Sequence, residues 1–159
     1  MVSRAEQQLM DNIEQFGFSV MHVPETIAGA LHEPGYSFSI GLYKKFQLPE
    51  IMIVGLDQEL CQTLIENISV DYEEGRALKV GEFNADIVEN FDCLVVPLDL
   101  PNYIAYLSWA RWFYKGNDFQ VVQIVYPDLL GLFPWDKDFS KKILQPVLGK
   151  KYEKGLAAG

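Results

Sequence analysis

Hydrophobic and polar positions alternate most regularly between Tyr36 and Tyr43, and this alternation predicts a strand. One face of the predicted strand is bulky and contains Tyr36, Phe38, Ile40 and Leu42. The other face contains only small residues, namely Ser37, Ser39 and Gly41. Closely packed backbone or a ligand should therefore lie against the small face.

Strand patterns also occur at residues 18–23, 51–54, 93–98 and 120–126. Residues 51–54 are apolar throughout, which is typical of a strand that is buried on both faces. Residues 25–35 are bounded by proline and glycine and are predicted to form a loop, with at most one short helical turn.

Helical periodicity follows Ser3, Asp57 and Asn102, and each of these residues is a favourable N-cap. Ser3 and Glu6 also have the spacing of a capping box. The predicted helix at residues 103–114 has aromatic side chains on every side, which is typical of a helix that is buried or covers a partner surface. A last short helix is expected at residues 140–148.

The order of these elements predicts the α+β class, because the strands do not alternate strictly with helices. We expect a single domain at residues 1–149, in which a mixed or mainly antiparallel sheet packs against two main helices. Residues 150–159 are expected to form a flexible, solvated tail.

The strand at 120–126 ends in a turn with a distinctive composition. Pro127 cannot continue a central ladder of hydrogen bonds, Asp128 can bond its own backbone, and Gly131 tolerates a positive φ angle. Aromatic residues flank this turn: Tyr126, Phe133 and Trp135. A carboxylate surrounded by aromatic side chains is a candidate ligand site.

Charge and cysteine content exclude several classes of function. The chain has 22 acidic and 13 basic residues and a net charge of −9, so its surface repels phosphate and no nucleic-acid partner is expected. No apolar run approaches membrane-spanning length and the N-terminus has no signal-peptide pattern, so we expect no membrane partner and a cytoplasmic location. Cys61 and Cys93 belong to no metal or redox motif and are predicted to be reduced core thiols.

Motifs for cofactor chemistry are also missing from the sequence. His22 and His32 lack the spacing of metal ligands, so no metal site is expected. Ser37 and Ser39 lie on a flat strand without the strained turn that exposes a serine nucleophile. Glycine-rich phosphate loops are absent, and no cofactor is expected. A flavin or another planar cofactor would fit small strand residues that face an aromatic wall, but nothing in the sequence requires one.

Several motifs occur in an order that resembles a known family. The early motifs are Gly17-Phe18, Tyr36–Leu42, Pro49-Glu50 and Gly55-Leu56, and the late motifs are Gln123, Tyr126-Pro127-Asp128, Gly131 and Phe133-Pro134-Trp135. With these motifs, the chain resembles the uncharacterised bacterial family called domain of unknown function 4262. It departs from the family pattern at His32–Gly35, where a second proline is common, and at Gln47-Leu48, where a Gly-His pair is expected. The second departure removes a histidine that could act as a catalyst or ligand. The resemblance implies a common fold, but it does not indicate an activity, because none is established for the family.

Glu50 and Asp128 are the two weak candidates for catalysis. Glu50 begins one buried strand and Asp128 follows another, so the two carboxylates would meet at one sheet edge if these strands were neighbours. Burial and mutual repulsion would then raise the pKa of one of them. The favoured alternative is that Glu50 caps a strand end and that Asp128 only forms a turn bond.

Two functions follow from these observations. The first is a non-catalytic binding protein, of the immunity type or a regulatory type, whose acidic surface and surplus aromatic residues suit a basic protein partner or a subunit contact in a homo-oligomer. We favour this function. The second is an enzyme or small-molecule binder that uses Asp128 or Glu50 as the acid–base group. Its ligand would lie beside Tyr36, Ser37, Gly41, Gln123, Tyr126, Asp128 and Trp135. Both functions require the strands at 36–43 and 120–126 to lie side by side, so that their ends share one pocket.

Overall fold

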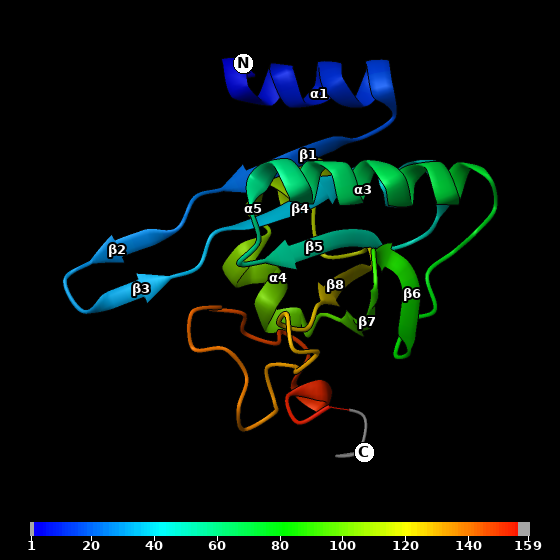
Figure 1. Ribbon diagram of the computed structural model, residues 1–159. Helices are drawn as coiled ribbons and strands as arrows, with labels where there is room; N and C mark the ends of the chain where they lie inside the picture. Colours follow the sequence, from blue (N-terminus) through cyan, green and yellow to red (C-terminus); the bar gives the residue numbers. More distant parts are fainter. Residues whose placement is uncertain (1, 156–159) are drawn as a thin grey trace.

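The structure is a computed structural model that describes residues 2–155 (Figure 1). Its centre is a six-stranded sheet, whose strands follow the order β1 (Ser19–Val23), β4 (Tyr36–Ile40), β5 (Glu50–Val54), β8 (Val121–Val125), β7 (Phe91–Pro97) and β6 (Phe83–Val88). The β5–β8 pair is parallel and the other pairs are antiparallel. Together with the helices, this mainly antiparallel mixed sheet confirms the predicted single α+β domain.

The two long helices begin at the predicted capping residues. The side chain of Ser3 accepts a hydrogen bond from the Glu6 N–H at 3.1 Å, and Glu6 accepts one from the Ser3 N–H at 2.8 Å, so the capping box of α1 (Arg4–Phe16) is complete. Asp57 accepts a hydrogen bond from the Leu60 N–H at 3.2 Å and caps α3 (Gln58–Glu73). These local signals therefore fix the start of both helices.

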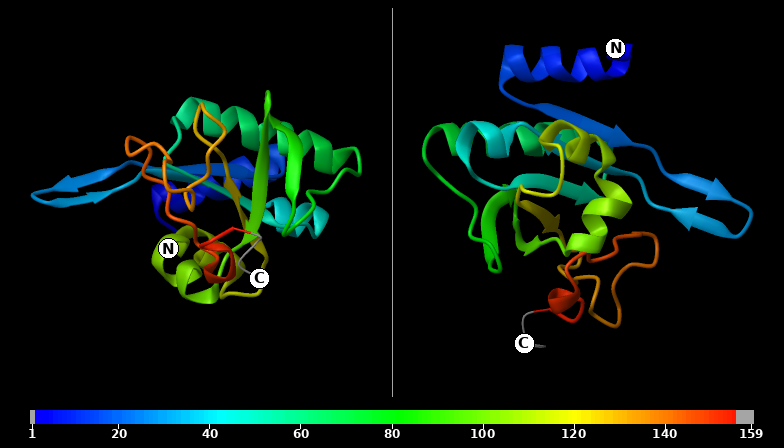
Figure 2. Two further views of the ribbon diagram at one scale, coloured as in Figure 1. Left: turned by 60° about the horizontal axis from the view of Figure 1, so that its bottom comes forward. Right: turned by 180° about the vertical axis from the view of Figure 1, so that it is seen from behind.

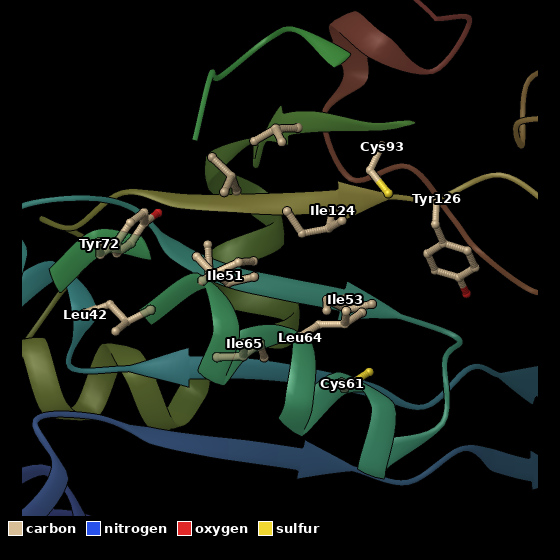
Figure 3. Packing of buried hydrophobic residues seen from close by; sticks show 13 residues of the cluster. Leu42, Ile51, Ile53, Cys61, Leu64, Ile65, Tyr72, Cys93, Ile124 and Tyr126 are labelled. Carbon is tan, nitrogen blue, oxygen red and sulfur yellow. The ribbon is translucent and has the colours of Figure 1, made fainter. Parts of the chain in front are cut away.

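Helix α3 covers one face of the sheet (Figure 3). Its inward stripe packs against alternate residues of the central strands, and the buried members of this cluster include Ile51, Ile53, Cys61, Leu64, Ile65, Tyr72, Cys93, Ile124 and Tyr126. The small face of β4 is directed to the same side, where Ser37 and Ser39 are fully buried. The close packing expected against these serines is thus provided by a helix, and the small side chains allow α3 to approach the sheet.

The opposite face is covered by α1, by two short helices and by the C-terminal segment (Figure 2). The short helices are α4 (Leu100–Tyr106) and α5 (Ser108–Tyr114), where one continuous helix was predicted. The break lies at Leu107, whose φ of −117° and ψ of 39° are not helical. Because the chain turns there, the aromatic residues are divided between two helices, and Trp112 stays 39% exposed.

Other short elements differ from the predictions. Residues 25–35 form a projecting hairpin of β2 (Thr26–Ala28) and β3 (Leu31–Glu33) instead of a loop (Figure 1). The strand predicted to reach Tyr43 ends at Ile40 and gives way to α2 (Leu42–Phe46). Residues 140–148 form no helix, whereas a single 3-10 turn, η1 (Lys150–Tyr152), follows them. Residues 156–159 of the predicted tail lie outside the described residues.

Within residues 2–155, no helix combines the length and the apolar composition that crossing a membrane requires.

Candidate functional site

Glu50 and Asp128 lie at opposite ends of two neighbouring parallel strands, which corrects the expectation that they could meet. The strands β5 and β8 are indeed neighbours, but they run parallel, and Glu50 pairs in register with Val121 at the start of β8. Asp128 follows the last residue of β8, at the opposite end of this strand pair. A paired-carboxylate site of the kind considered for Glu50 and Asp128 is therefore not formed.

The two strands that were expected to lie side by side are also separated. Strand β5 lies between β4 and β8. Strand β4 runs antiparallel to β5, and its first residue, Tyr36, pairs with Val54. Tyr36 therefore lies at the end of the sheet where β5 and β8 both stop. The predicted direct contact between these two strands was therefore wrong, although β4 begins at the end of the sheet where β8 stops.

Glu50 is the most completely enclosed charged side chain described, with 1% of its surface exposed. Its carboxylate accepts hydrogen bonds from five donors. These donors are the Ser39 hydroxyl at 2.8 Å, the N–H groups of Gly41 at 2.8 Å, Leu42 at 3.1 Å and Tyr43 at 3.3 Å, and the Tyr114 hydroxyl. A carboxylate offers about four lone-pair positions, so these donors leave no acceptor position for a substrate.

The electrostatics of this cluster are dominated by burial. Burial raises the pKa of Glu50 above its ordinary value of 4.5, although the hydrogen bonds from Tyr114, Ser39, Gly41 and Tyr43 act in the opposite direction. Burial and the adjacent carboxylate raise the pKa of Tyr114 as well. The Tyr114 hydroxyl also accepts a hydrogen bond from the Lys44 N–H at 3.2 Å. The cluster thus fastens α2 and α5 to the start of β5.

Three of the early sequence motifs meet at this cluster. Ser39, Gly41 and Leu42 come from the strand motif, and Glu50 comes from the Pro-Glu pair. Gly41 has a φ of +118°, and a Cβ atom at this position would lie 2.6 Å from the carbonyl oxygen of Gly17. The Gly-Phe motif that begins at Gly17 therefore also touches the cluster, and Gly41 must be glycine for two separate reasons.

Asp128 organises the loop that follows β8. Its Oδ1 accepts hydrogen bonds from the N–H groups of Leu130 at 3.0 Å and Leu132 at 2.9 Å, and its Oδ2 accepts one from the Ser140 N–H at 3.0 Å. Burial alone would raise the pKa of Asp128, but these three N–H donors lower it below its ordinary value of 3.8. The predicted turn bond is therefore part of a larger cap that closes the loop from Leu130 to Ser140.

The other predicted ligand residues lie in several places. Tyr36 donates to the Tyr106 carbonyl oxygen at 2.8 Å, and Tyr126 donates to the Val54 carbonyl oxygen at 2.7 Å. Gln123 is fully buried in the middle of β8. Trp135 stacks on Phe133 with ring centroids 5.1 Å apart, on the side covered by the C-terminal segment. The structure does not gather these residues around one pocket.

Two glutamines attach the C-terminal segment to the sheet. Gln123 donates to the Pro146 carbonyl oxygen and accepts from the Leu148 N–H, both at 2.8 Å. Gln145 accepts from the Tyr126 N–H at 3.0 Å and donates to the Tyr126 carbonyl oxygen at 2.9 Å. Gln145 was not singled out in the sequence, because an isolated glutamine in an irregular segment has no pattern that marks it.

A hydrogen-bonded chain of side chains links β4, β1 and α3. The Ser37 hydroxyl lies 2.6 Å from Nδ1 of His22, and Nε2 of His22 lies 2.9 Å from Oε1 of Gln62. Gln62 in turn donates to Glu66 at 2.8 Å. Ser37 is 1% exposed, so its hydroxyl is closed to a substrate. The partner Gln62 lies 40 positions beyond His22, and no sequence motif connects them.

One pocket lies at the end of the sheet where β5 stops. It has a volume of about 410 Å³ and is lined by segments that are distant in the sequence. Its polar lining residues are Glu25, His32, Tyr36, Asp57, Gln58 and Lys142. Asp128 and Trp135 do not line it. A small polar molecule is the kind of ligand that this mixture of charges and hydrogen-bonding groups suits.

Among residues 2–155, no group of three or more His, Cys, Asp and Glu side chains could hold a metal ion. Cys61 and Cys93 are both free and buried. Burial raises the pKa of Cys93 to about 12, so its thiol is protonated at neutral pH.

Comparison with known proteins gives one match. A family model described as "Domain of unknown function (DUF4262)" matches residues 12–140. No curated protein matches the chain, and no solved structure matches it.

Proposed function

The chain belongs to the DUF4262 family, whose description states no activity, and we propose that it is a protein-interaction module without catalytic activity. The observation that carries this proposal is a hydrogen-bonded loop that presents two adjacent leucines to solvent. Leu129 is 90% exposed and Leu130 is 84% exposed. They are the most exposed large hydrophobic side chains in residues 2–155.

The backbone around these leucines is held by several hydrogen bonds. Besides the three bonds to its carboxylate, Asp128 donates its N–H to the Leu132 carbonyl oxygen at 2.7 Å and accepts from the Gly131 N–H at 2.9 Å. A fixed loop loses little conformational entropy when it binds, and a preformed apolar projection is therefore an efficient anchor. Contact with an apolar pocket on a partner would remove the two leucine side chains from water, which is energetically favourable.

The arrangement of the carboxylates also supports a binding role. The oxygens of Glu50 accept five hydrogen bonds and those of Asp128 accept three, and all of these bonds serve the fold. General acid–base catalysis requires a carboxyl group within hydrogen-bond reach of a substrate. The two candidate groups are instead used to hold a helix start and a loop.

The test is capture of a partner by the immobilised full chain, followed by an affinity measurement with the captured protein. The variant Leu129→Ser/Leu130→Ser should fold normally and bind roughly a hundredfold more weakly, because losing two buried leucines costs about 3 kcal/mol. A matched control, Leu100→Ser/Ile104→Ser, removes two half-exposed apolar side chains from α4. The proposal is wrong if the loop variant binds like the unmodified protein.

A second candidate function is small-molecule binding in the pocket of about 410 Å³ at the end of β5. The observation in its favour is the convergence of Tyr36, Asp57 and Lys142 from three distant segments. Binding there should raise the melting temperature in a ligand screen, and Lys142→Ala should abolish that rise. A screen in which the Lys142→Ala variant responds like the unmodified protein would count against this site.

A further inference from the structure

The two edges of the central sheet differ in how well they are protected. At one edge, the pairing of β6 with β7 shifts register between Asn84 and Val88, and Asp86 has a φ of +71°. Such irregularity prevents another strand from adding to the sheet. At the other edge, β1 pairs with β4 in continuous register from Ser19 to Val23. The outer side of β1 is therefore a regular strand edge.

This regular edge forms the floor of a groove. Helix α1 packs on one face of the sheet and α3 on the other, so that β1 lies between them (Figures 1 and 2). A pocket of about 460 Å³ follows the start of β1, with Phe16 from α1 on one side and Gln62, Glu66 and Val70 from α3 on the other. Phe16 is 59% exposed and Val70 is 54% exposed, so the groove has an apolar rim.

The one charged residue among those that line the groove is acidic, Glu66. Helix α3 has no lysine or arginine, and its acidic residues outside the groove include Asp71 and Glu73, which pair with Arg76 at 2.6 Å and Lys45 at 3.5 Å. Glu66 lines the groove and is exposed. The β1 strand itself contributes no lysine, the residue with which many proteins protect an edge strand from pairing. A basic segment would therefore be attracted to the groove, and an acidic segment would be repelled.

We infer that the outer edge of β1 binds an extended basic segment of a partner protein by strand addition. The backbone of the segment would pair with the outward N–H and C=O groups of β1. Alternate side chains of an added strand point to opposite faces. Lysine or arginine on one face would approach Glu66, and apolar residues on the other would contact Phe16. This inference rests on the proposed function as an interaction module, but it concerns a surface separate from the Leu129–Leu130 loop.

The test uses a defined probe, a labelled strand-length peptide in which lysine and valine alternate. We expect saturable binding by fluorescence anisotropy at low salt, which weakens as salt is raised. Hydrogen exchange of the β1 amides should slow in the complex. A peptide that alternates glutamate and valine should not bind, and neither should the lysine–valine peptide methylated at every backbone nitrogen, because it cannot donate hydrogen bonds to a strand edge.

Variants locate the binding surface. Glu66→Lys should weaken binding about tenfold, because it turns an attraction of up to about 1 kcal/mol into a repulsion of similar size. Glu89→Lys makes the same charge change at an exposed position beside β6, and it should bind the peptide like the unmodified protein. The Leu129→Ser/Leu130→Ser variant should also bind the peptide normally.

Three outcomes would overturn the inference: no binding of the lysine–valine peptide, equal binding of the fully methylated peptide, or binding without protection of the β1 amides. None of them affects the proposed function, which depends on the loop variant and the captured partner. Conversely, a loop variant that keeps its partner would contradict the proposed loop interface without changing the result with the peptide.

Discussion

The hydroxyl of Tyr114 at the end of α5 donates a hydrogen bond to the buried carboxylate of Glu50 at the start of β5. The two residues are 64 positions apart in the chain. This contact joins α5 to the start of β5, where the first residue of α2 also binds Glu50. The carboxylate is therefore a structural centre, and changes to it should affect stability first.

Replacing Tyr114 with phenylalanine should lower the free energy of unfolding by about 1–3 kcal/mol, because it removes a buried hydrogen bond to a carboxylate and leaves the Lys44 N–H without its acceptor. Urea denaturation followed by circular dichroism measures this change. Tyr106→Phe is the matched control, since the Tyr106 hydroxyl has no hydrogen-bond partner within residues 2–155. An equal loss in both variants would show that the contact with Glu50 is not important.

The contribution of Glu50 to stability should fall as the pH rises. Its pKa is raised in the folded state, so the folded protein holds this proton more tightly than the unfolded chain does. The resulting stabilisation is fully present below the ordinary pKa of 4.5 and is lost as the pH rises through the folded value. The stability difference between the unmodified protein and Glu50→Gln should therefore shrink from acidic to neutral pH. A difference that grows with pH would contradict the raised pKa.

Asp128 should have the opposite pH dependence. Its pKa is lowered in the folded state, so its stabilisation is present above the ordinary value of 3.8 and is lost as the pH falls through the folded value. Asp128→Asn should therefore lower the melting temperature at neutral pH and have a smaller effect at strongly acidic pH. Thermal unfolding at several pH values measures both effects. Faster proteolysis between Leu129 and Ser140 at neutral pH should accompany the loss.

Gly41→Ala should destabilise the fold by about 1–3 kcal/mol, because it combines a positive φ angle with a Cβ atom only 2.6 Å from the Gly17 carbonyl oxygen. Gly116→Ala provides the control. Gly116 has a φ of +146°, and a Cβ atom there would have no neighbour within 4 Å. The larger loss should therefore occur at Gly41. Equal losses in denaturant unfolding would mean that the contact between Gly17 and Gly41 contributes nothing.

Neither cysteine should react with a thiol reagent in the folded protein at pH 8. Cys61 and Cys93 are fully buried, and burial raises the pKa of both thiols. Addition of denaturant should expose both thiols together, and a colorimetric thiol assay measures this release. Rapid reaction of one cysteine before unfolding would show that the core opens locally around it.

Local signals in the sequence were sufficient to predict both long helices and five of the six strands of the central sheet, but not β6. Ser3 and Asp57 cap the long helices because a short side chain can reach the free N–H groups of the first turn. The hairpin of β2 and β3 was missed because each strand has only three residues and lies between prolines at positions 24 and 34. The start of α2 was missed because the hydrophobic alternation continues through Leu42, although Gly41 already turns the chain.

The candidate sites depended on contacts that a sequence does not reveal. Whether Glu50 could meet Asp128 depended on the direction of β8 relative to β5, and no local pattern in either strand gives that direction. Likewise, nothing near Tyr114 indicates that its hydroxyl ends at Glu50. The turn bond of Asp128 was predictable because it involves its own loop. Its third donor, Ser140, lies 12 positions away and was not.

The single parallel pairing of β5 with β8 has a consequence for how the chain folds. Strands β1, β4 and β5 come from the first half of the chain, and β6, β7 and β8 come from the second, so each half can assemble its own antiparallel ribbon from nearby residues. Only the seam between β5 and β8 must wait for the two ribbons to dock, which makes it the slow, entropically expensive step. Two separate fragments, divided between α3 and β6, should therefore reassemble across this seam into one native particle.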